Sequence, residues 1–219
     1  MANSKIKFTR TREVQLPTRG HAHDAGIDFY VPTFDPVFMA DLKLKNQELF
    51  QNRDLYLSPN AGCLTLSGGS NQSSVNFELN DSNNSPVKYD DEKGLNYLLL
   101  PPLSRINIPS GIYCQMENSG RALIAANKSG VASKEGLIFG AQVVDFEYQG
   151  EIHINVINTS SKVVRIYSGQ KLIQFLETPI FTSTIEEVDT LQNLYKGATS
   201  RADGGFGSTD KKDVVQLNS

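Results

Sequence analysis

Residues 151–156, which read Glu-Ile-His-Ile-Asn-Val, indicate the fold class because polar and apolar side chains alternate along them. A period of two places every second side chain on the same face of a β-strand. The same alternation, or nearly the same, recurs at residues 5–8, 105–108 and 171–175. Gly, Pro, Asn and Ser interrupt the pattern about every 8–12 residues, the spacing of an antiparallel sandwich or barrel. The sequence therefore predicts an all-β domain.

Helical signals are few. Ser129 to Lys134 predicts one short helix, and residues 183–186 (Ser-Thr-Ile-Glu) have the pattern of a capping box. Residues 35–95 differ in composition, with Asn/Ser/Gly clusters and nine acidic against five basic side chains. A loop without regular structure is one interpretation of this segment. Alternating apolar residues favour the other, an inserted β-rich excursion; these residues are Leu55/Leu57, Leu64/Leu66 and Val75/Phe77/Leu79.

The composition of the 219-residue chain excludes several classes of protein. Hydrophobic residues make up 39% of it, enough to bury a core, so wholesale disorder is excluded. The formal net charge is −3, without the basic excess expected for direct nucleic-acid binding. The most apolar run, residues 97–103, contains two prolines and is far shorter than the ~20 residues that span a bilayer.

Two further features bear on the cellular compartment. No apolar stretch follows the charges of residues 1–11, so we expect no secretory signal. Cys63 and Cys114 are too few for a disulfide framework, and buried free thiols are favoured over a single bridge. We therefore expect a soluble, cytoplasmic protein with no membrane contact.

Several common catalytic motifs are absent from the sequence. It contains no P-loop, no dinucleotide-binding glycine fingerprint, no His-Glu-x-x-His and no Cys-x-x-Cys. His21 and His23 lie two residues apart in a polar stretch. Without a third suitable ligand nearby, we expect them to be solvated loop residues rather than a metal site.

Two of the four remaining candidate segments lie near predicted strand or helix ends. In residues 25–28 (Ala-Gly-Ile-Asp) a carboxylate follows an apolar strand position, which is a weak signal alone. Residues 128–130 (Lys-Ser-Gly) open the predicted helix, where free N–H groups and the helix dipole favour an anion such as phosphate. A plain serine cap beside an exposed lysine is the equally weighted alternative.

The other two segments each combine an aromatic residue with a charged one. Residues 140–150 (Gly-Ala-Gln-Val-Val-Asp-Phe-Glu-Tyr-Gln-Gly) predict a β-hairpin with Asp145 at the end of one arm and Tyr148 at the turn. Turn chemistry alone is one interpretation, since Asp is favoured in turns. Residues 201–209 (Arg-Ala-Asp-Gly-Gly-Phe-Gly-Ser-Thr) hold Phe206 among glycines. In a segment that closes over a nucleobase, such an aromatic side chain can stack on the flat base. The guanidinium of Arg201 can donate two parallel hydrogen bonds to a phosphate.

In this order, and together with residues 169–175 (Gly-Gln-Lys-Leu-Ile-Gln-Phe), these segments resemble the five motifs of the dUTPase family of the homotrimeric jelly-roll type. The resemblance covers the chain except residues 35–95 and about the last ten. It implies a distorted jelly-roll β-barrel with one short helix. The implied organisation is a discontinuous core at 1–34 and 96–200, an inserted subdomain at 35–95 and a flexible C-terminal lid at 201–219.

The resemblance implies hydrolysis of dUTP to dUMP and pyrophosphate by Mg²⁺-assisted attack of water on the α-phosphorus. This reaction limits uracil incorporation into DNA and supplies dUMP for dTMP synthesis. Asp145 would orient and deprotonate the water. Asp28 would help to hold the hydrated metal, which neutralises the leaving pyrophosphate.

The resemblance also implies the substrate contacts. The backbone of the arm from Gly140 to Val144 would read the uracil edge, and Tyr148 would pack on the deoxyribose and exclude a 2′-hydroxyl. Phe206 would stack over the base when the tail of another subunit closes. The expected phosphate contacts are Lys128, Ser129, Gly130 and Gln174, with Arg201, Gly207, Ser208 and Thr209 on the outer phosphates.

Three departures from the family pattern stand out. Lys128 replaces the usual arginine and lacks its planar fork, which puts a bidentate role in doubt. Ala202 and Asp203 replace commoner small residues, and Asp203 adds a negative charge near the triphosphate. The third departure is the insertion at 35–95.

Two alternatives were weighed against dUTP hydrolysis. A dCTP deaminase needs a glutamate in the strand after the hairpin, where Asn155 stands, so deamination is disfavoured. A regulatory protein-binding role through the 35–95 insertion, as in some phage members of the family, can coexist with hydrolysis. For a phage-encoded chain, the expected location is the host cytoplasm.

Overall fold

The computed structural model describes residues 5–51, 86–195 and Gly197, in two compact units, Met1–Phe181 and Thr182–Ser219. In the second unit, α5 (Leu191–Leu194) is capped by the side chain of Thr190, which accepts the N–H of Asn193. The described elements of the first unit are β1 (Ile6–Arg10), β2 (Gly26–Tyr30), α1 (Pro36–Lys45), α2 (Gln47–Gln51), β3 (Val87–Asp90), β4 (Leu95–Leu100), β5 (Arg105–Met116), β6 (Arg121–Asn127), α4 (Ser129–Glu135), β7 (Leu137–Phe139), β8 (Val143–Val144), β9 (Ile152–Asn158), β10 (Val164–Tyr167) and β11 (Lys171–Pro179).

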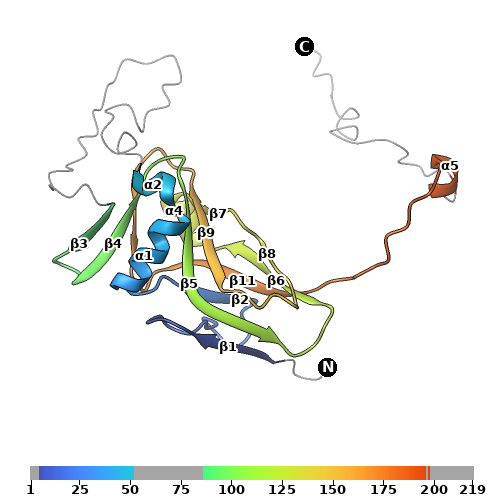
Figure 1. Ribbon diagram of the computed structural model, residues 1–219, viewed down its shortest axis with the longest axis horizontal. Coiled ribbons are helices and arrows are strands. Elements are labelled where there is room, and N and C mark those ends of the chain that lie inside the picture. The colour runs from blue at the N-terminus through green and yellow to red at the C-terminus, as the bar shows by residue number, and fades with distance from the viewer. Residues whose placement is uncertain (1–4, 52–85, 196, 198–219) are drawn as a thin grey trace, which may run out of the picture. The chain divides into compact units, whose positions relative to one another are not determined.

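The strands of the first unit form three antiparallel sheets (Figure 1). Their strand orders are β1-β5-β9-β7, β10-β4-β3 and β2-β11-β6-β8. The alternation at residues 151–156 takes the predicted form, since Ile152, Ile154 and Val156 are at most 1% exposed while the residues between them are half-buried. The expected all-β class is confirmed, although the described strands pair as three sheets rather than one closed barrel.

The β-rich expectation for residues 35–95 is wrong at its N-terminal end, where α1 and α2 are helical. The Asp35 side chain accepts the N–H of Phe38 at 2.8 Å, and Pro36 occupies the first turn, so both residues favour a helix start. At the other end of the segment, β3 and the start of β4 are strands, as expected. Residues 52–85, with Cys63 and the alternating pairs that suggested strands, lie outside the described part of the chain.

Helix α1 packs into the core of the first unit. Phe38 and Leu42 are at most 1% exposed and belong to the same apolar cluster as the strand residues. Past the end of α1, the amide of Asn46 bonds to both backbone groups of Asn107 on β5, accepting its N–H at 2.8 Å and donating to its carbonyl at 2.9 Å. The division into core, insertion and tail stays a proposal.

Two local predictions have different outcomes. The helix expected over Ser129 to Lys134 is confirmed as α4, which ends at Gly136 in the left-handed conformation (φ 70°). The capping box at residues 183–186 is wrong, because no helix begins there and the next helix begins at Leu191. Cys114 is a half-buried free thiol whose pKa is raised by burial. In the described ranges, no helix is long and apolar enough to cross a membrane.

Candidate active site

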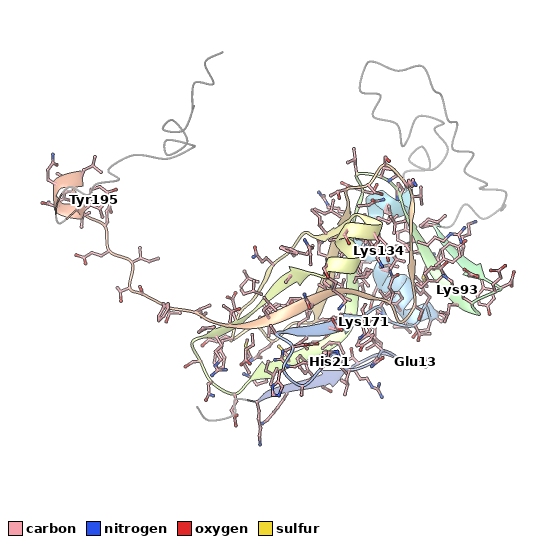
Figure 2. The ribbon with its side chains drawn as sticks, turned by 180° about the vertical axis from the view of Figure 1, so that it is seen from behind. Glu13, His21, Lys93, Lys134, Lys171 and Tyr195 are labelled. Atoms are coloured by element: carbon pink, nitrogen blue, oxygen red, sulfur yellow. The ribbon has the colours of Figure 1, made fainter. Side chains whose placement is uncertain are left out.

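Asp28 is the centre of the best-defined polar cluster. It lies in β2 and is 4% exposed. Its Oδ1 accepts a hydrogen bond from Lys128 Nζ at 2.5 Å, and its Oδ2 lies 3.0 Å from Lys171 Nζ. Lys128 follows β6 and Lys171 opens β11, so three segments far apart in the sequence meet at one carboxylate (Lys171 is labelled in Figure 2).

The two lysines control the ionisation of this carboxylate. Burial alone would raise the pKa of Asp28, but hydrogen bonds and charges from Lys128 and Lys171 outweigh burial and hold that pKa below its usual value. The same contact with Asp28 raises the pKa of Lys171. Two ammonium groups facing one carboxylate leave a net positive charge at the surface of this cluster, which suits a polyanion.

Gln174 lies beside Asp28 because β11 pairs with both β2 and β6. Its register partners are Asp28 on one side and Ala126 on the other. Its side chain donates to the carbonyl of Asn127 at 3.0 Å and covers Gly26, where an added Cβ would overlap the Gln174 amide. This close approach explains the glycine that precedes Ile27 and Asp28 in the motif.

Helix α4 places Ser129 and Gly130 next to Lys128. Both are exposed, and Lys128 is the capping residue of the helix. A Cβ on Gly130 would meet nothing within 4 Å, so packing within the chain does not require glycine there. Glycine instead leaves open surface beside the lysine, which is what a close ligand needs.

The hairpin predicted at residues 140–150 differs from the expected one in its pairing. Its outer arms are β7 and β9, and Gly140 N–H donates to the carbonyl of Asn155 at 2.9 Å. Beyond Gly140 the chain leaves this sheet, and β8 pairs with β6, with Val144 opposite Leu123. The segment therefore connects two sheets, a non-local pairing that the local sequence pattern does not reveal.

Asp145 and Tyr148 form the turn that follows β8. The N–H of Tyr148 donates to the carbonyl of Asp145 at 3.1 Å, and the Asp145 side chain is exposed. The Tyr148 hydroxyl donates to the carbonyl of Glu151 at 3.0 Å, and its ring lies over Gly150, where any Cβ would overlap it. Tyr148 thus has a fixed ring with 43% of its surface still exposed.

The two carboxylates, Asp28 and Asp145, do not meet within one chain. Three strand spacings separate β2 from β8, about 14 Å at 4.8 Å each. Along β6, Leu123 (opposite Val144) is three residues from Ala126 (level with Asp28 through Gln174), or about 10 Å. Asp28 and Val144 are therefore on the order of 17 Å apart. One water cannot contact both carboxylates of a single chain.

Comparisons with known proteins agree with this motif geometry. The family model described as dUTPase matches residues 93–210, more than half of the chain. A deoxyuridine 5′-triphosphate nucleotidohydrolase of Desulfitobacterium hafniense is 33% identical over 114 residues, which cover 51% of this chain and 72% of that protein. This chain belongs to the dUTPase family.

Solved structures of phage dUTPases share the fold. The dUTPase of Staphylococcus bacteriophage 80alpha, solved with dUPNHPP, superposes with a TM-score of 0.54 at 15% identity, covering 93% of this chain and 97% of that one. A dUTPase mutant from phage phi11 of S. aureus, described as coordinating a structural Mg(II) ion, gives a TM-score of 0.52 at 15% identity, with 86% and 99% covered. At this identity the likeness shows the fold alone.

The residues of this dUTPase do not fit a magnesium site built by the protein alone. In the described ranges, no three His, Cys, Asp or Glu side chains are grouped so that they could hold a metal. Asp28, the expected metal residue, has one lysine on each of its oxygens. His21 and His23 are exposed, as expected for solvated loop residues (His21 is labelled in Figure 2).

The expected tail contacts cannot be placed. Arg201, Phe206, Gly207, Ser208 and Thr209 lie outside the described residues.

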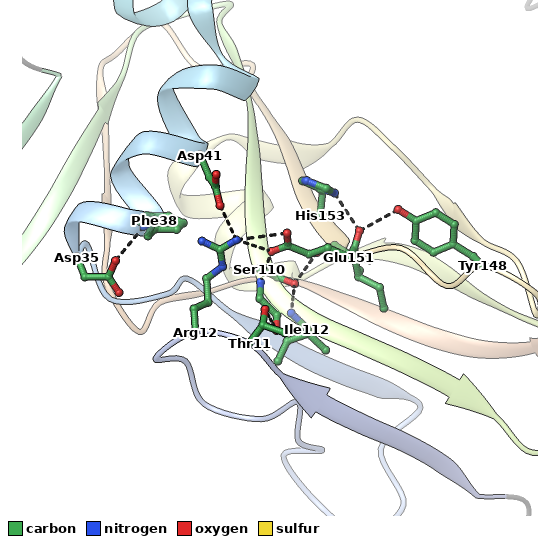
Figure 3. A network of polar contacts seen from close by, with 12 residues as sticks. Thr11, Arg12, Asp35, Phe38, Asp41, Ser110, Ile112, Tyr148, Glu151 and His153 are labelled. Carbon is green, nitrogen blue, oxygen red and sulfur yellow. Dashed lines mark hydrogen bonds and ion pairs between the residues drawn. The ribbon is translucent and has the colours of Figure 1, made fainter.

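Sequence reasoning missed two groups of residues around the site. Lys171 belongs to the motif at residues 169–175. Its position at the start of a strand does not indicate that its side chain faces Asp28. Arg12 and Glu151 were also missed: Arg12 Nη2 lies 3.2 Å from Glu151 Oε1, behind the Tyr148 turn (Figure 3). Glu151 directly follows the 140–150 segment, and an acidic residue at that position was the available signal.

Proposed function

We propose that the chain hydrolyses dUTP to dUMP and pyrophosphate. The observation that carries the proposal is the meeting of Asp28, Lys128 and Gln174, which come from three separate dUTPase motifs, at one place in the fold. Residues far apart in the sequence that share no site have no chemical reason to converge in this way.

In the proposed reaction, water attacks the α-phosphorus and the bond from that phosphorus to the bridging oxygen of the leaving pyrophosphate breaks. Asp145 accepts the proton of the water. An ionised aspartate is a weak base, so it must lie within hydrogen-bond reach of a water already polarised by the phosphate. The exposed Asp145 side chain at the end of β8 is accessible for this role.

Asp28 acts with its two lysines in this proposal. Lys128 and Lys171 direct positive charge toward the phosphates, while Asp28 fixes where both ammonium groups lie. Ser129, Gly130 and Gln174 supply further polar contacts to the same phosphates. Magnesium bound to the triphosphate would supply neutralisation of the leaving pyrophosphate.

The backbone from Gly140 to Val144 selects uracil, and the Tyr148 ring selects the deoxyribose. The hydrogen bond from the Tyr148 hydroxyl to the Glu151 carbonyl supports this role, because a ring held in this position excludes a 2′-hydroxyl by contact. The tail residues Arg201 and Phe206 to Thr209 close over the nucleotide as a lid.

We further propose a homotrimer whose sites are shared between chains. The separation on the order of 17 Å between Asp28 and Val144, the residue before Asp145, supports this arrangement. A second copy that contributes its Asp145 turn to the Asp28 cluster completes the set of groups. Shared sites of this kind follow naturally from closed rotational symmetry.

The test is pyrophosphate release from dUTP, dCTP, dTTP and UTP with Mg²⁺ present. We expect turnover of dUTP with strong preference over the other three. Comparable turnover of dCTP, or ammonia release from it, contradicts the proposal.

A matched pair of variants identifies the base. Asp145→Asn is expected to lower turnover by ~10²-fold or more, the usual scale for a positioned base. Glu147→Gln, which changes an exposed acid in the same turn, is expected to leave turnover near that of the unmodified enzyme. Equal losses in the two variants would show that the turn rather than the Asp145 carboxylate matters.

A second function, protein binding through the insertion, is favoured by one comparison. The 80alpha dUTPase is described as controlling transfer of virulence genes by a G protein-like mechanism. We propose that the 35–95 insertion of this chain binds a protein partner, in addition to hydrolysis and in the cytoplasm. Binding that persists in the Asp145→Asn variant would separate the two functions.

A further inference from the structure

Arg12 lies between helix α1 and the turn that carries Tyr148. It follows β1, and its guanidinium is 10% exposed (Figure 3). Its Nη2 donates to Asp41 Oδ2 at 2.9 Å and to the Glu151 carboxylate at 3.2 Å and 3.3 Å. Asp41 belongs to α1, whereas Glu151 directly follows the 140–150 segment.

All hydrogen bonds of this guanidinium pass through one nitrogen. Within the described part of the chain, Arg12 Nε and Nη1 are buried and have no hydrogen-bond partner. The stem of Arg12 rests on Gly111, where an added Cβ would overlap it, and its guanidinium lies 5.8 Å from the Phe38 ring centroid. Because only Nη2 forms these bonds, loss of either carboxylate leaves the guanidinium with a single carboxylate partner.

Glu151 in turn fixes the Tyr148 turn. Its carboxylate accepts the N–H of Gly111 at 2.5 Å as well as Arg12, so the side chain is anchored on β5. Its backbone carbonyl accepts the Tyr148 hydroxyl and the Nδ1–H of His153, each at 3.0 Å. A shift of Glu151 therefore moves the acceptor that holds the Tyr148 ring.

We propose that Arg12 is a positioning residue that couples α1, through Asp41 and Glu151, to the Tyr148 ring and so to discrimination between 2′-deoxyribose and ribose. The inference rests on the proposed function for its substrate, but Arg12 and Asp41 lie outside the dUTPase motifs. Helix α1 thereby contributes to the selection of the sugar. Displacement of α1 removes Asp41 from Arg12, loosens Glu151 and lets the Tyr148 ring admit a 2′-hydroxyl.

The test uses one variant at each of the two carboxylates that contact Arg12, and one control variant. Asp41→Asn removes the α1 carboxylate, which is 45% exposed, without leaving a buried cavity. Glu151→Gln removes the charge at the turn and keeps the backbone carbonyl. Glu48→Gln is the control, because it deletes an equal charge from a 91% exposed side chain on α2 that lies 4.0 Å from Arg105.

The first readout is the ratio of kcat/KM for dUTP to that for UTP. We expect this ratio to fall by roughly threefold in Asp41→Asn, the size expected for a partly exposed ion pair such as Asp41–Arg12. It should fall further in Glu151→Gln, because Glu151 and Arg12 are both largely buried. Glu48→Gln should keep the ratio of the unmodified enzyme. A purely structural role would lower both activities equally and leave the ratio unchanged, which would overturn the proposal.

The second readout needs no substrate. Amide hydrogen exchange of residues 143–151 should become faster in Asp41→Asn than in Glu48→Gln, while β6 and β11 exchange as in the unmodified protein. Unchanged exchange in the turn overturns the coupling even if dUTP is hydrolysed. Faster exchange in a chain that hydrolyses neither nucleotide would leave the coupling standing and refute the proposed function instead.

Discussion

Asp28 Oδ2 and Lys171 Nζ lie 3.0 Å apart across β2 and β11. Lys128 holds the other oxygen of the same carboxylate, so the aspartate of the first dUTPase motif is bonded to a residue after β6 and to another in β11. The pKa of Asp28 is held below its usual value of 3.8 by these partners, against the opposing effect of burial. The contact between Asp28 and Lys171 therefore affects the pH range over which the Asp28 carboxylate is ionised.

Replacement of Lys171 by Met is expected to raise the pKa of Asp28, because one of the two stabilising cations is gone while burial remains. If the ionised carboxylate is required, the acid limb of the kcat/KM profile for dUTP moves to higher pH. Lys171→Arg keeps the charge and should restore the original limb. An unchanged acid limb in Lys171→Met would show that Asp28 ionisation does not limit the reaction.

The stability of the first unit depends on α1. Phe38 is fully buried, so Phe38→Ala should lower the free energy of unfolding by ~3–5 kcal/mol through lost burial and the cavity left behind. The neighbouring Val37 is 69% exposed, and Val37→Ala should change stability by less than about 0.5 kcal/mol. Thermal or urea unfolding measures both. Equal stability of the two variants would mean that α1 does not belong to the core.

His153 makes stability depend on pH in the weakly acidic range. Burial lowers its pKa from the usual 6.5, the charge and carbonyl of Glu151 oppose that change, and the charges of Lys45 and Arg12 add to it. The unfolded chain therefore binds a proton as pH falls through about 6.5 while the folded chain does not. Stability contributed by neutral His153 is present above this pH and is lost below it.

His153→Gln should therefore show a smaller drop in Tm between pH 7.5 and pH 5.5 than the unmodified protein. His21→Gln, at an exposed loop position, serves as the control and should keep the full drop. A drop of the same size in His153→Gln would assign the pH dependence to other groups.

Much of the fold could be predicted from local pattern. Strict alternation identified β9, and the Lys-Ser-Gly start identified α4, because a period of two and a helix start are both local properties. Helix α1 was missed, since its Asp35 cap and Pro36 were read as part of an acidic, loop-like segment. Its burial depends on strands that lie far away in sequence.

The candidate site was predictable only in part. The order of the motifs predicted Asp28, Lys128 and Gln174 as site residues, and the structure brings these three together. The second lysine on Asp28 and the pairing of β8 with β6 depend on which strands become neighbours, and no local pattern records that. The Arg12–Glu151 contact joins residues 139 positions apart, so only the folded chain reveals it.

The measurement that tests the account most directly is complementation between two inactive variants. Asp28→Asn and Asp145→Asn are made separately, checked for folding by thermal unfolding, and then co-expressed with different tags so that mixed assemblies can be purified. Each variant alone should hydrolyse dUTP at ~10²-fold or more below the unmodified rate.

If every site takes Asp28 from one chain and Asp145 from the next, each purified trimer that contains both variants keeps about a third of its sites with both carboxylates intact. The purified mixed trimers should then hydrolyse dUTP at about a third of the unmodified rate. If mixed assemblies form but show no more activity than either variant alone, the two carboxylates do not meet between chains, and the shared-site account of dUTP hydrolysis is contradicted.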